Sequence, residues 1–417
     1  MTIQEIIETA EKDLKDRFSE IEKTEAYWTR RILKAFQEKE VSYRHFAGTT
    51  GYGNGDIGRD TLESVFATVF GAEAAIVRPS IASGTAALAQ TLYGLVLPGD
   101  EIVSATGRPY DTMEEILGIN EGECAPGSMK EMGVSYKEVP LTDSGEIDLP
   151  AVEAVITKNT KLIIAQRSRG YSWRPSLMPD QFEGLCTMIH EKHPGIRVMV
   201  DNCYGEFVAF CEPSEKGADV CVGSLIKNAG GGLAPTGGYM VGKKDAIERI
   251  ASHITAPGIG LEVGSYAQGY QLFFQGLFMA PHTVAQAIKT ACLAARVFEI
   301  LGLQSVPGSM EKRSDIIQAI RLETPERLIR FCQGIQMASP IDSMAMPEPW
   351  DMPGYTDQVI MAAGTFVAGA SIELSADGPM RAPYTAYLQG SLTYVHGKIA
   401  LEKALEHMVS GNAIRIP

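Results

Sequence analysis

The chain has 417 residues, of which 45% are hydrophobic and 21% charged, a composition typical of a soluble globular protein with two or three domains. Its 37 Lys and Arg residues against 51 Asp and Glu give a net charge of -14. A protein with this charge has no surplus of basic residues to bind nucleic acids or anionic membranes, so the sequence argues against both partners. No apolar run approaches the roughly 20 residues of a membrane span, and the charged start lacks the apolar core of a signal peptide.

Residues 1–45 predict a helical arm. Apolar residues recur at steps of three and four from Ile3 to Phe36, which is the period of an amphipathic helix. We expect this arm to lie on another surface, either of its own chain or of a partner subunit. The glycine-rich stretch HFAGTTGYGNGDIGRDTLE (45–63) predicts a loop up to Asp60, where Asp60 and Glu63 have the spacing of a capping box and a helix is expected to begin.

A large α/β domain is predicted over residues 46–290. Short β-branched runs predict strands at 74–78, 101–105, 134–139, 162–166, 197–201, 219–224 and 238–242. Helical patterns fall between many of them, for instance at 84–96, 150–157 and 178–192. Strands that are apolar throughout and separated by helices indicate a mostly parallel sheet covered on both faces.

Helical patterns then dominate from about residue 263 to 301, and a smaller α+β domain is predicted over residues 291–417. Its expected helices are 311–320, 325–336 and 392–409, and its expected strands lie near 358–362, 369–374 and 384–388. Seven scattered cysteines form no CxxC pair, which indicates no metal site and no disulfide framework, so a reducing, cytoplasmic setting is expected.

Residues that could bind a ligand follow the predicted strands, because ligands gather at the carboxyl ends of strands in open α/β sheets. After the first strand, the turn Ser83-Gly84-Thr85 opens a helix and could hold a phosphate, although simple helix capping explains it equally well when it is taken alone. Asp201 ends an apolar strand, where a desolvated carboxylate needs a positive partner, and Tyr204 follows three residues later.

Lys227 allows three interpretations. In VGSLIKNAGGGLAPTGGYM (222–240) the glycines follow the lysine, whereas a phosphate-binding P-loop places glycine before it and Ser or Thr after it. A solvated loop lysine is the ordinary case. A lysine just beyond a buried strand, with Ser224 three residues before it, also suits covalent attachment of a carbonyl group.

One cofactor accounts for these signals together. Pyridoxal phosphate (PLP) needs a lysine for its aldehyde, a carboxylate for its pyridinium nitrogen and a cup for its phosphate. It also commonly stacks on an aromatic ring, and Tyr110 follows the second predicted strand. The order of phosphate turn, aromatic residue, Asp and Ser-x-x-Lys is far more specific than any member alone, so PLP is the predicted cofactor.

At this point the chain resembles the fold-type-I PLP enzymes of cysteine and methionine metabolism, the cystathionine lyases and methionine γ-lyases. It is most similar to the branch of carbon–sulfur lyases named "aluminium resistance" proteins. The matching motifs are GYGNGDIGRDTLE (51–63), SGTAAL (83–88), GRPYDT (107–112), QRSRGYSWRPS (166–176), DNCYGEF (201–207), SLIKNAGGGLAPTGGY (224–239), TAPGIGLEVG (255–264), FQGLFMAPH (274–282) and SIELSADGPMRAPY (371–384). The resemblance implies the α/β fold of aspartate aminotransferase, fold type I, a small amino acid as substrate, and at least a dimer, with a tetramer as the expected assembly.

The resemblance also implies roles for individual residues. Lys227 would hold PLP covalently and then move the substrate Cα proton, Asp201 would pair with the pyridinium nitrogen, and Tyr110 would stack on the ring. The expected phosphate ligands are Ser83, Gly84, Thr85 and Ser224. Tyr204 has the spacing at which relatives place a tyrosine on the cofactor phenolate oxygen. Tyr52 resembles a tyrosine that reaches the neighbouring subunit's site, and Arg381 would grip the substrate α-carboxylate.

Departures from the better-known lyases leave the substrate open. Those enzymes carry Thr directly before the lysine and an Asn-Pro segment, where this chain has Ile226 and Gln166-Arg167-Ser168-Arg169. Arg167 and Arg169 could bind a carboxylate or the cofactor, or could order the loop. The predicted activity is a PLP-dependent carbon–sulfur lyase, with β- or γ-elimination unresolved. Another PLP reaction, such as transamination or aldol-type cleavage, and a non-catalytic stress-response protein that keeps the fold are the alternatives.

Overall fold

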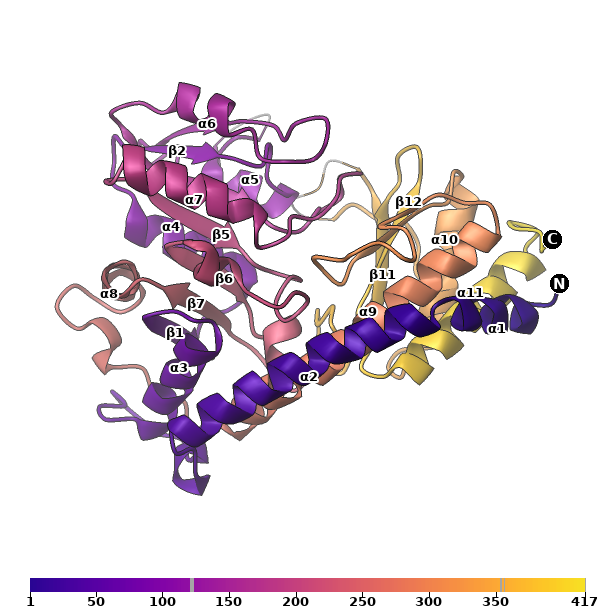
Figure 1. The fold of residues 1–417 in the computed structure, drawn as a ribbon, viewed down its shortest axis with the longest axis horizontal. Helices are drawn as coiled ribbons and strands as arrows, with labels where there is room; N and C mark the ends of the chain where they lie inside the picture. The colour runs from indigo at the N-terminus through magenta and orange to yellow at the C-terminus, as the bar shows by residue number, and fades with distance from the viewer. Residues whose placement is uncertain (121–123, 353–354, 356, 417) are drawn as a thin grey trace.

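Two sheets lie side by side along a pair of long helices (Figure 1). The computed structural model describes residues 1–120, 124–352, 355 and 357–416. A seven-stranded sheet lies at one end of the molecule and a five-stranded sheet at the other, and α2 (Lys15–Glu38) and α9 (Gln271–Ile300) run past both. None of the helices in these described stretches has the length and apolar character to cross a membrane.

The seven-stranded sheet has the order β1-β7-β6-β5-β4-β2-β3, and β7 runs opposite to the other strands. Its strands are β1 (Ala74–Arg78), β2 (Glu101–Ser104), β3 (Ser135–Glu138), β4 (Thr160–Gln166), β5 (Arg197–Asp201), β6 (Val220–Ser224) and β7 (Gly238–Gly242). The predicted mostly parallel sheet is confirmed, and β1, β5 and β7 have the predicted bounds.

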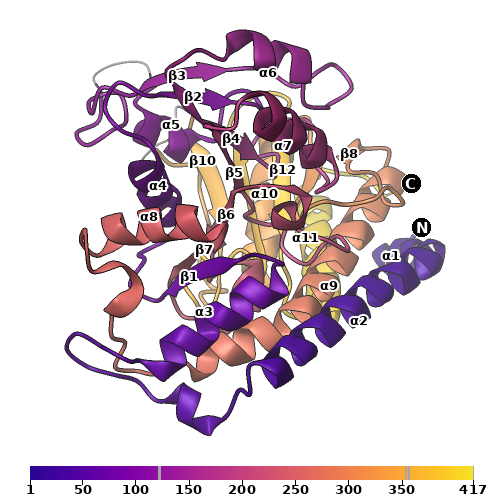
Figure 2. The same cartoon turned by 60° about the vertical axis from the view of Figure 1, so that its left-hand side comes forward.

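Helices cover both faces of this sheet because neighbouring residues of its strands point in opposite directions (Figure 2). Leu162 and Ile164 of β4 pack in the cluster with α4 (Gly84–Leu95) and α8 (Lys244–Ile254). Ile163, between them, packs in the cluster on the other face. The helices of that second face are α3 (Ile57–Val69), α6 (Leu149–Val155) and α7 (Gln181–Lys192). The apolar strands predicted from the sequence are therefore buried on both sides.

The N-terminal arm consists of α1 (Ile3–Asp13) and α2, and it lies on the chain's own α9. Phe36 of α2 packs edge-on against Phe274 of α9. The ion pair Lys289–Glu22 joins α9 to α2, and the pair Arg296–Asp13 joins α9 to α1, at 2.8 Å each. The structure thus selects the first of the two surfaces that the sequence left open for the arm.

The five-stranded sheet is antiparallel, with the order β10-β11-β12-β9-β8. Its strands are β8 (Ser305–Val306), β9 (Gln318–Arg321), β10 (Val359–Ala362), β11 (Ser375–Pro379) and β12 (Thr385–Gln389). The helices α10 (Pro325–Met337) and α11 (Tyr394–Ser410) pack against each other beside this sheet. The predicted smaller α+β unit is confirmed in kind, while its boundary at residues 290 and 291 stays a prediction and falls inside α9.

Three local predictions were wrong. Residues 311–320 contain no helix, because residues 318–321 form β9 and pair with distant β12. Residues 369–374 form no strand; Glu373 instead accepts the backbone N–H groups of Phe366 and Val367 at 2.7 and 2.8 Å. Helix α3 begins at Ile57 rather than Asp60, since the Asp56 carboxylate accepts the Arg59 backbone N–H at 3.0 Å and acts as the cap.

Candidate active site

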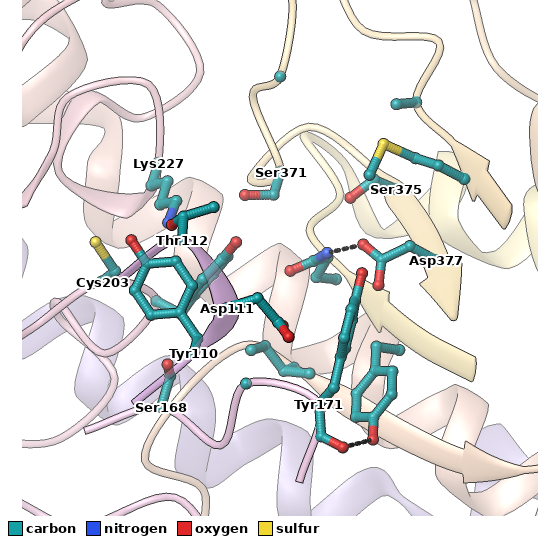
Figure 3. A pocket seen from close by; sticks show the side chains of 18 of the residues that line it. Tyr110, Asp111, Thr112, Ser168, Tyr171, Cys203, Lys227, Ser371, Ser375 and Asp377 are labelled. Atoms are coloured by element: carbon teal, nitrogen blue, oxygen red, sulfur yellow. Dashed lines mark hydrogen bonds between the residues drawn. The ribbon is translucent and has the colours of Figure 1, made fainter. Parts of the chain in front are cut away.

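A cavity of about 290 Å³ lies between the two sheets. Its wall on the seven-stranded side includes Thr85, Tyr110, Asp201, Tyr204 and Lys227. Residues of the five-stranded side, among them Ser371, Ser375 and Asp377, form the facing wall (Figure 3). The predicted core of the site is therefore brought together in one pocket.

Sheet topology places the first wall. Because β4, β5 and β6 are parallel neighbours, Gln166, Asp201 and Ser224 all end at the same edge. Lys227 follows β6 after a short turn. The α4 helix starts at this edge too, and a Cβ added to its first residue, Gly84, would come within 3.0 Å of the Ser224 Cβ. Glycine at residue 84 thus lets the backbone of the α4 N-terminus lie close to Ser224 without a crowded side-chain contact.

Lys227 is surrounded by groups that can carry negative charge. Its Nζ lies 4.0 Å from the centre of the Tyr204 ring. Burial lowers the pKa of Lys227, but Cys203, Tyr204, Tyr110 and Asp201 together raise it well above its ordinary value. At neutral pH the side chain is an ammonium group whose positive charge compensates the negative charge of Asp201.

Asp201 is a buried carboxylate with few partners. Its Oδ1 accepts the Cys203 backbone N–H at 3.0 Å. Burial raises its pKa, while the positive charge of Lys227 and the hydrogen bond from Cys203 lower it. A desolvated carboxylate held in this way is suited to a cationic ring nitrogen.

Tyr110 is held from two sides. Its backbone N–H donates to the Gln166 Oε1 at 2.9 Å, and its hydroxyl lies 3.3 Å from the Thr85 Oγ1. Burial and the charge of Asp201 raise its pKa far above the usual value, so it stays a neutral phenol at neutral pH. A neutral ring in a fixed position can stack on a flat cofactor.

The phosphate turn combines the two interpretations that the sequence left open. Ser83 caps α4, because its Oγ accepts the Ala86 backbone N–H at 3.0 Å. The first N–H groups of α4 remain available for an anion, and the helix dipole favours negative charge there. Of the four expected phosphate ligands, Thr85 lines the cavity. Ser83, Gly84 and Ser224 are not among the lining residues, although Gly84 directly precedes Thr85 and lies close to Ser224.

The remaining predicted residues lie outside the cavity lining. Tyr52 is 78% exposed in the glycine-rich loop. Arg381 is half-exposed and pairs with Asp357 at 2.8 Å. Burial raises the pKa of Asp111 and of Tyr387, both of which line the cavity, and the charge of Arg381 offsets part of this rise, so Arg381 lies near the rim.

Arg167 and Arg169 are buried away from the cavity. The Nη1 of Arg167 lies 3.2 Å from Glu212 Oε2, with both side chains fully buried, and it donates to Asn202 Oδ1 at 2.7 Å. Arg169 donates to the backbone oxygen of Val306 at 2.9 Å, and burial lowers its pKa. These contacts join the loop after β4 to β5 and to the five-stranded side.

Sequence reasoning missed the wall on the five-stranded side. It includes Ser371, Ser375, Asp377, Tyr387 and Gln389, and Tyr171 of the loop after β4 packs against Tyr387 beside it. The alternation Ser375-Ala376-Asp377 is a usable signal, because alternate strand residues face the same side. The signal was missed because the strand was expected at residues 369–374, whereas the observed strand β11 begins at Ser375.

The donor set fits PLP. A lysine faces the cavity beside a buried carboxylate, a neutral phenol lies next to them, and a helix N-terminus with a serine at its edge can take the phosphate. Two observations support this fit. Gly84, which has no side chain, lets the α4 N-terminus lie close to Ser224. The Asp201 carboxylate accepts the Cys203 backbone N–H and can accept a further hydrogen bond from a cofactor.

Comparisons with known proteins agree with this arrangement. A sequence profile of the methionine gamma-lyase family matches residues 3–409. The uncharacterised protein YnbB of Bacillus subtilis (strain 168) is 51% identical over 92% of this chain and 91% of its own. A candidate cystathionine beta-lyase involved in aluminium resistance from Listeria monocytogenes has a TM-score of 0.94 and 46% identity, over 97% of this chain and 99% of that one. A carbon-sulfur lyase involved in aluminium resistance from Clostridium novyi has a TM-score of 0.93 and 45% identity, over 97% and 96%.

Proposed function

The chain belongs to the methionine gamma-lyase family, and we propose that it cleaves the carbon–sulfur bond of a small sulfur-containing amino acid, releasing a 2-oxo acid, ammonia and a thiol. It is a lyase of the carbon–sulfur type, and pyridoxal phosphate is its cofactor. The proposal concerns the substrate, which is of the cystathionine, cysteine or methionine type, and the position of the bond that breaks.

One observation carries the proposal: Lys227 and Asp201 follow the ends of adjacent parallel strands and face the same cavity. When bound, pyridoxal phosphate supplies an electron sink for negative charge at the substrate Cα. Lys227 provides the amine that attaches the cofactor, and later the group that takes and returns the Cα proton. Asp201 keeps a positive charge on the ring nitrogen.

Other residues hold the cofactor and orient the substrate. The α4 N-terminus and Ser224 bind the phosphate, and Tyr110 and Tyr204 border the ring. Arg381 pairs with Asp357 at the rim, and the substrate α-carboxylate takes the place of Asp357 in that pair. Arg167 and Arg169 order the loop after β4, which is the second role weighed for them, because their contacts lie within the protein.

A substrate panel tests the proposal. The purified holoenzyme, incubated separately with L-cystathionine, L-cysteine and L-methionine, should release thiol and 2-oxo acid in equal amounts from at least one of them. Equal amounts are expected because both products come from the same elimination. Thiol is measured with a thiol-reactive dye and 2-oxo acid with a dehydrogenase-coupled assay. Exchange of amino groups without thiol release would show a transaminase instead.

We propose that Tyr52 serves the cavity of a neighbouring subunit, because its ring is exposed and outside its own cavity. The variants Tyr52→Ala and Lys227→Ala should then be nearly inactive alone. Co-expressed subunits should recover up to about one quarter of wild-type activity, since one site in two is intact in half of the dimers formed at random. Sedimentation of the holoenzyme gives the assembly, at least a dimer. Activity of the mixture equal to the sum of the two variants would contradict shared sites.

A further inference from the structure

Asp377 is a buried carboxylate on the wall of the cavity that faces Lys227 (Figure 3). The residue is 6% exposed and lies in the middle of β11. Its Oδ2 accepts one hydrogen bond, from the Gln389 Nε2 at 2.9 Å. Its Oδ1 is buried and has no hydrogen-bond partner within the part of the chain that the structure describes. The donors that act on this carboxylate, Tyr171 and Gln389, are both neutral, so it has no charged partner among the described residues that line the cavity.

Among the residues that the structure describes, no cation acts on this carboxylate. Among the described residues that line the cavity, the acidic ones are Asp111, Asp201 and Asp377, and Lys227 is the basic one. The groups that act on the pKa of Asp377 are neutral: burial raises the pKa to about 7, and Tyr171 and Gln389 lower it. Because the opposite charges of Lys227 and Asp201 compensate each other on the other wall, the negative charge of Asp377 stays uncompensated.

Three tyrosines surround the same place. The Tyr171 ring centre lies 5.0 Å from that of Tyr387 and 5.6 Å from that of Tyr355. The Tyr387 hydroxyl donates to the backbone oxygen of Tyr171 at 2.6 Å, which holds these two rings together. All three rings line the cavity. Aromatic faces beside a carboxylate are the surroundings that a desolvated ammonium group prefers.

We propose that Asp377, with the rings of Tyr171, Tyr355 and Tyr387, forms a cation subsite that binds a second ammonium group on the leaving-group half of the substrate. This inference rests on the proposed lyase function and names its substrate class: amino-acid thioethers with a distal ammonium, in preference to apolar ones. The reacting amino group belongs at Lys227, so the ammonium at the facing wall is a different one. The hydroxyls of Ser371 and Ser375, also buried without partners among the described residues, add polar contacts on this wall.

A pair of substrates of equal shape tests the subsite. S-(2-aminoethyl)-L-cysteine and S-propyl-L-cysteine differ only in a terminal ammonium against a methyl group. The holoenzyme should favour the first by about 10- to 100-fold in kcat/KM, the range expected for one hydrogen-bonded charge pair. Asp377→Asn, which keeps the shape and removes the charge, should lower this ratio by the same factor.

Glu326→Gln is the matched control, because it removes one negative charge at an exposed position of the same part of the chain. Its ratio should equal that of the wild type. Thermal unfolding checks that Asp377→Asn folds. A wild-type preference for S-propyl-L-cysteine, or a ratio unchanged in Asp377→Asn, would overturn the proposal.

The pH dependence gives a test that needs no variant. The titratable groups that face Asp377 are Tyr171, Tyr355, Tyr387 and Cys332, whose pKa values are all raised, so they stay neutral near pH 7. Asp377 is ionised above its pKa of about 7 and protonated below it. The preference for the ammonium substrate should therefore rise from pH 6 to pH 8 in the wild type. A flat or falling ratio would contradict the subsite.

Binding separates this inference from the lyase proposal. L-Lysine has the shape of S-(2-aminoethyl)-L-cysteine but no carbon–sulfur bond, and L-2-aminoheptanoate is its uncharged counterpart. Calorimetry on the holoenzyme should show tighter binding of L-lysine, and Asp377→Asn should remove the difference. If this holds while no thioether is cleaved, the subsite stands and the lyase proposal fails. If thioethers are cleaved without any preference for L-lysine, the subsite fails and the lyase proposal stands.

Discussion

Lys227→Ala should lower the rate of carbon–sulfur bond cleavage by at least about 10⁴-fold, the upper range for losing a positioned acid–base group. The loss exceeds that range if covalent attachment also fails, because the same amine performs both tasks. Lys227 lies in the cavity beside Asp201, and the described cavity lining contains no other amine to replace it. The rate is measured as thiol release under saturating cofactor and substrate.

A chemical label identifies the same residue. Borohydride reduction of the wild-type holoenzyme should leave a pyridoxyl group on the peptide that contains Lys227, and mass spectrometry should find no such label in Lys227→Ala. Lys244→Ala is the matched control, since Lys244 is an exposed lysine with only a weak pair to Glu248 at 3.8 Å. A label on another lysine, or normal turnover by Lys227→Ala, would refute the assignment.

Asp201→Asn should lower kcat by about 10²- to 10³-fold, the cost of removing one preorganised electrostatic group from an active site. Asparagine keeps the size of the side chain and can keep the hydrogen bond from the Cys203 backbone N–H. It cannot keep a positive charge on the ring nitrogen, so the cofactor becomes a weaker electron sink. The measurement is single-turnover thiol release.

The borohydride label on Lys227 should persist in Asp201→Asn, which separates a defect in chemistry from a defect in attachment. Asp180→Asn is a suitable control because Asp180 is exposed and pairs with Lys216 at the surface. Full activity of Asp201→Asn would show that Asp201 does not support the ring. Loss of the label would place its effect on attachment instead.

The strands of the large sheet were predictable because their signal is local. β7 is a short run that is buried throughout, and β5 is buried after its first residue. Apolar β-branched residues in such runs mark a strand whatever its neighbours are. The start of α3 was not predictable in this way. Asp56 is selected as its cap with support from the Tyr270 hydroxyl, which donates to Asp56 Oδ2 at 2.8 Å from a distant part of the chain. β9 likewise depends on pairing with β12.

The same distinction divides the site. Asp201, Ser224 and Lys227 follow strands in sequence, and strand order alone brings such ends to one edge. Asp377 belongs to β11 and Tyr387 to β12 of the second sheet, and only the packing of one sheet beside the other brings them to one cavity with Lys227. The SIELSADGPMRAPY motif contains Asp377 and Arg381, but its local pattern does not say which of its polar residues reaches the cavity.

The helix α9 connects the parts of the chain that form the two walls of the cavity. Near its middle, the Thr283 Oγ1 on α9 donates to the Gly231 oxygen at 3.1 Å, in the glycine segment that follows Lys227. Near its end, Glu299 accepts the Ser309 N–H at 2.7 Å, and the helix packs against β9 and β12 of the facing sheet. The same helix thus contacts both the segment that follows Lys227 and the sheet that contains Asp377. If the proposed cation subsite binds the distal ammonium, a substrate that reaches both walls would be selected by its length as well as by its charge.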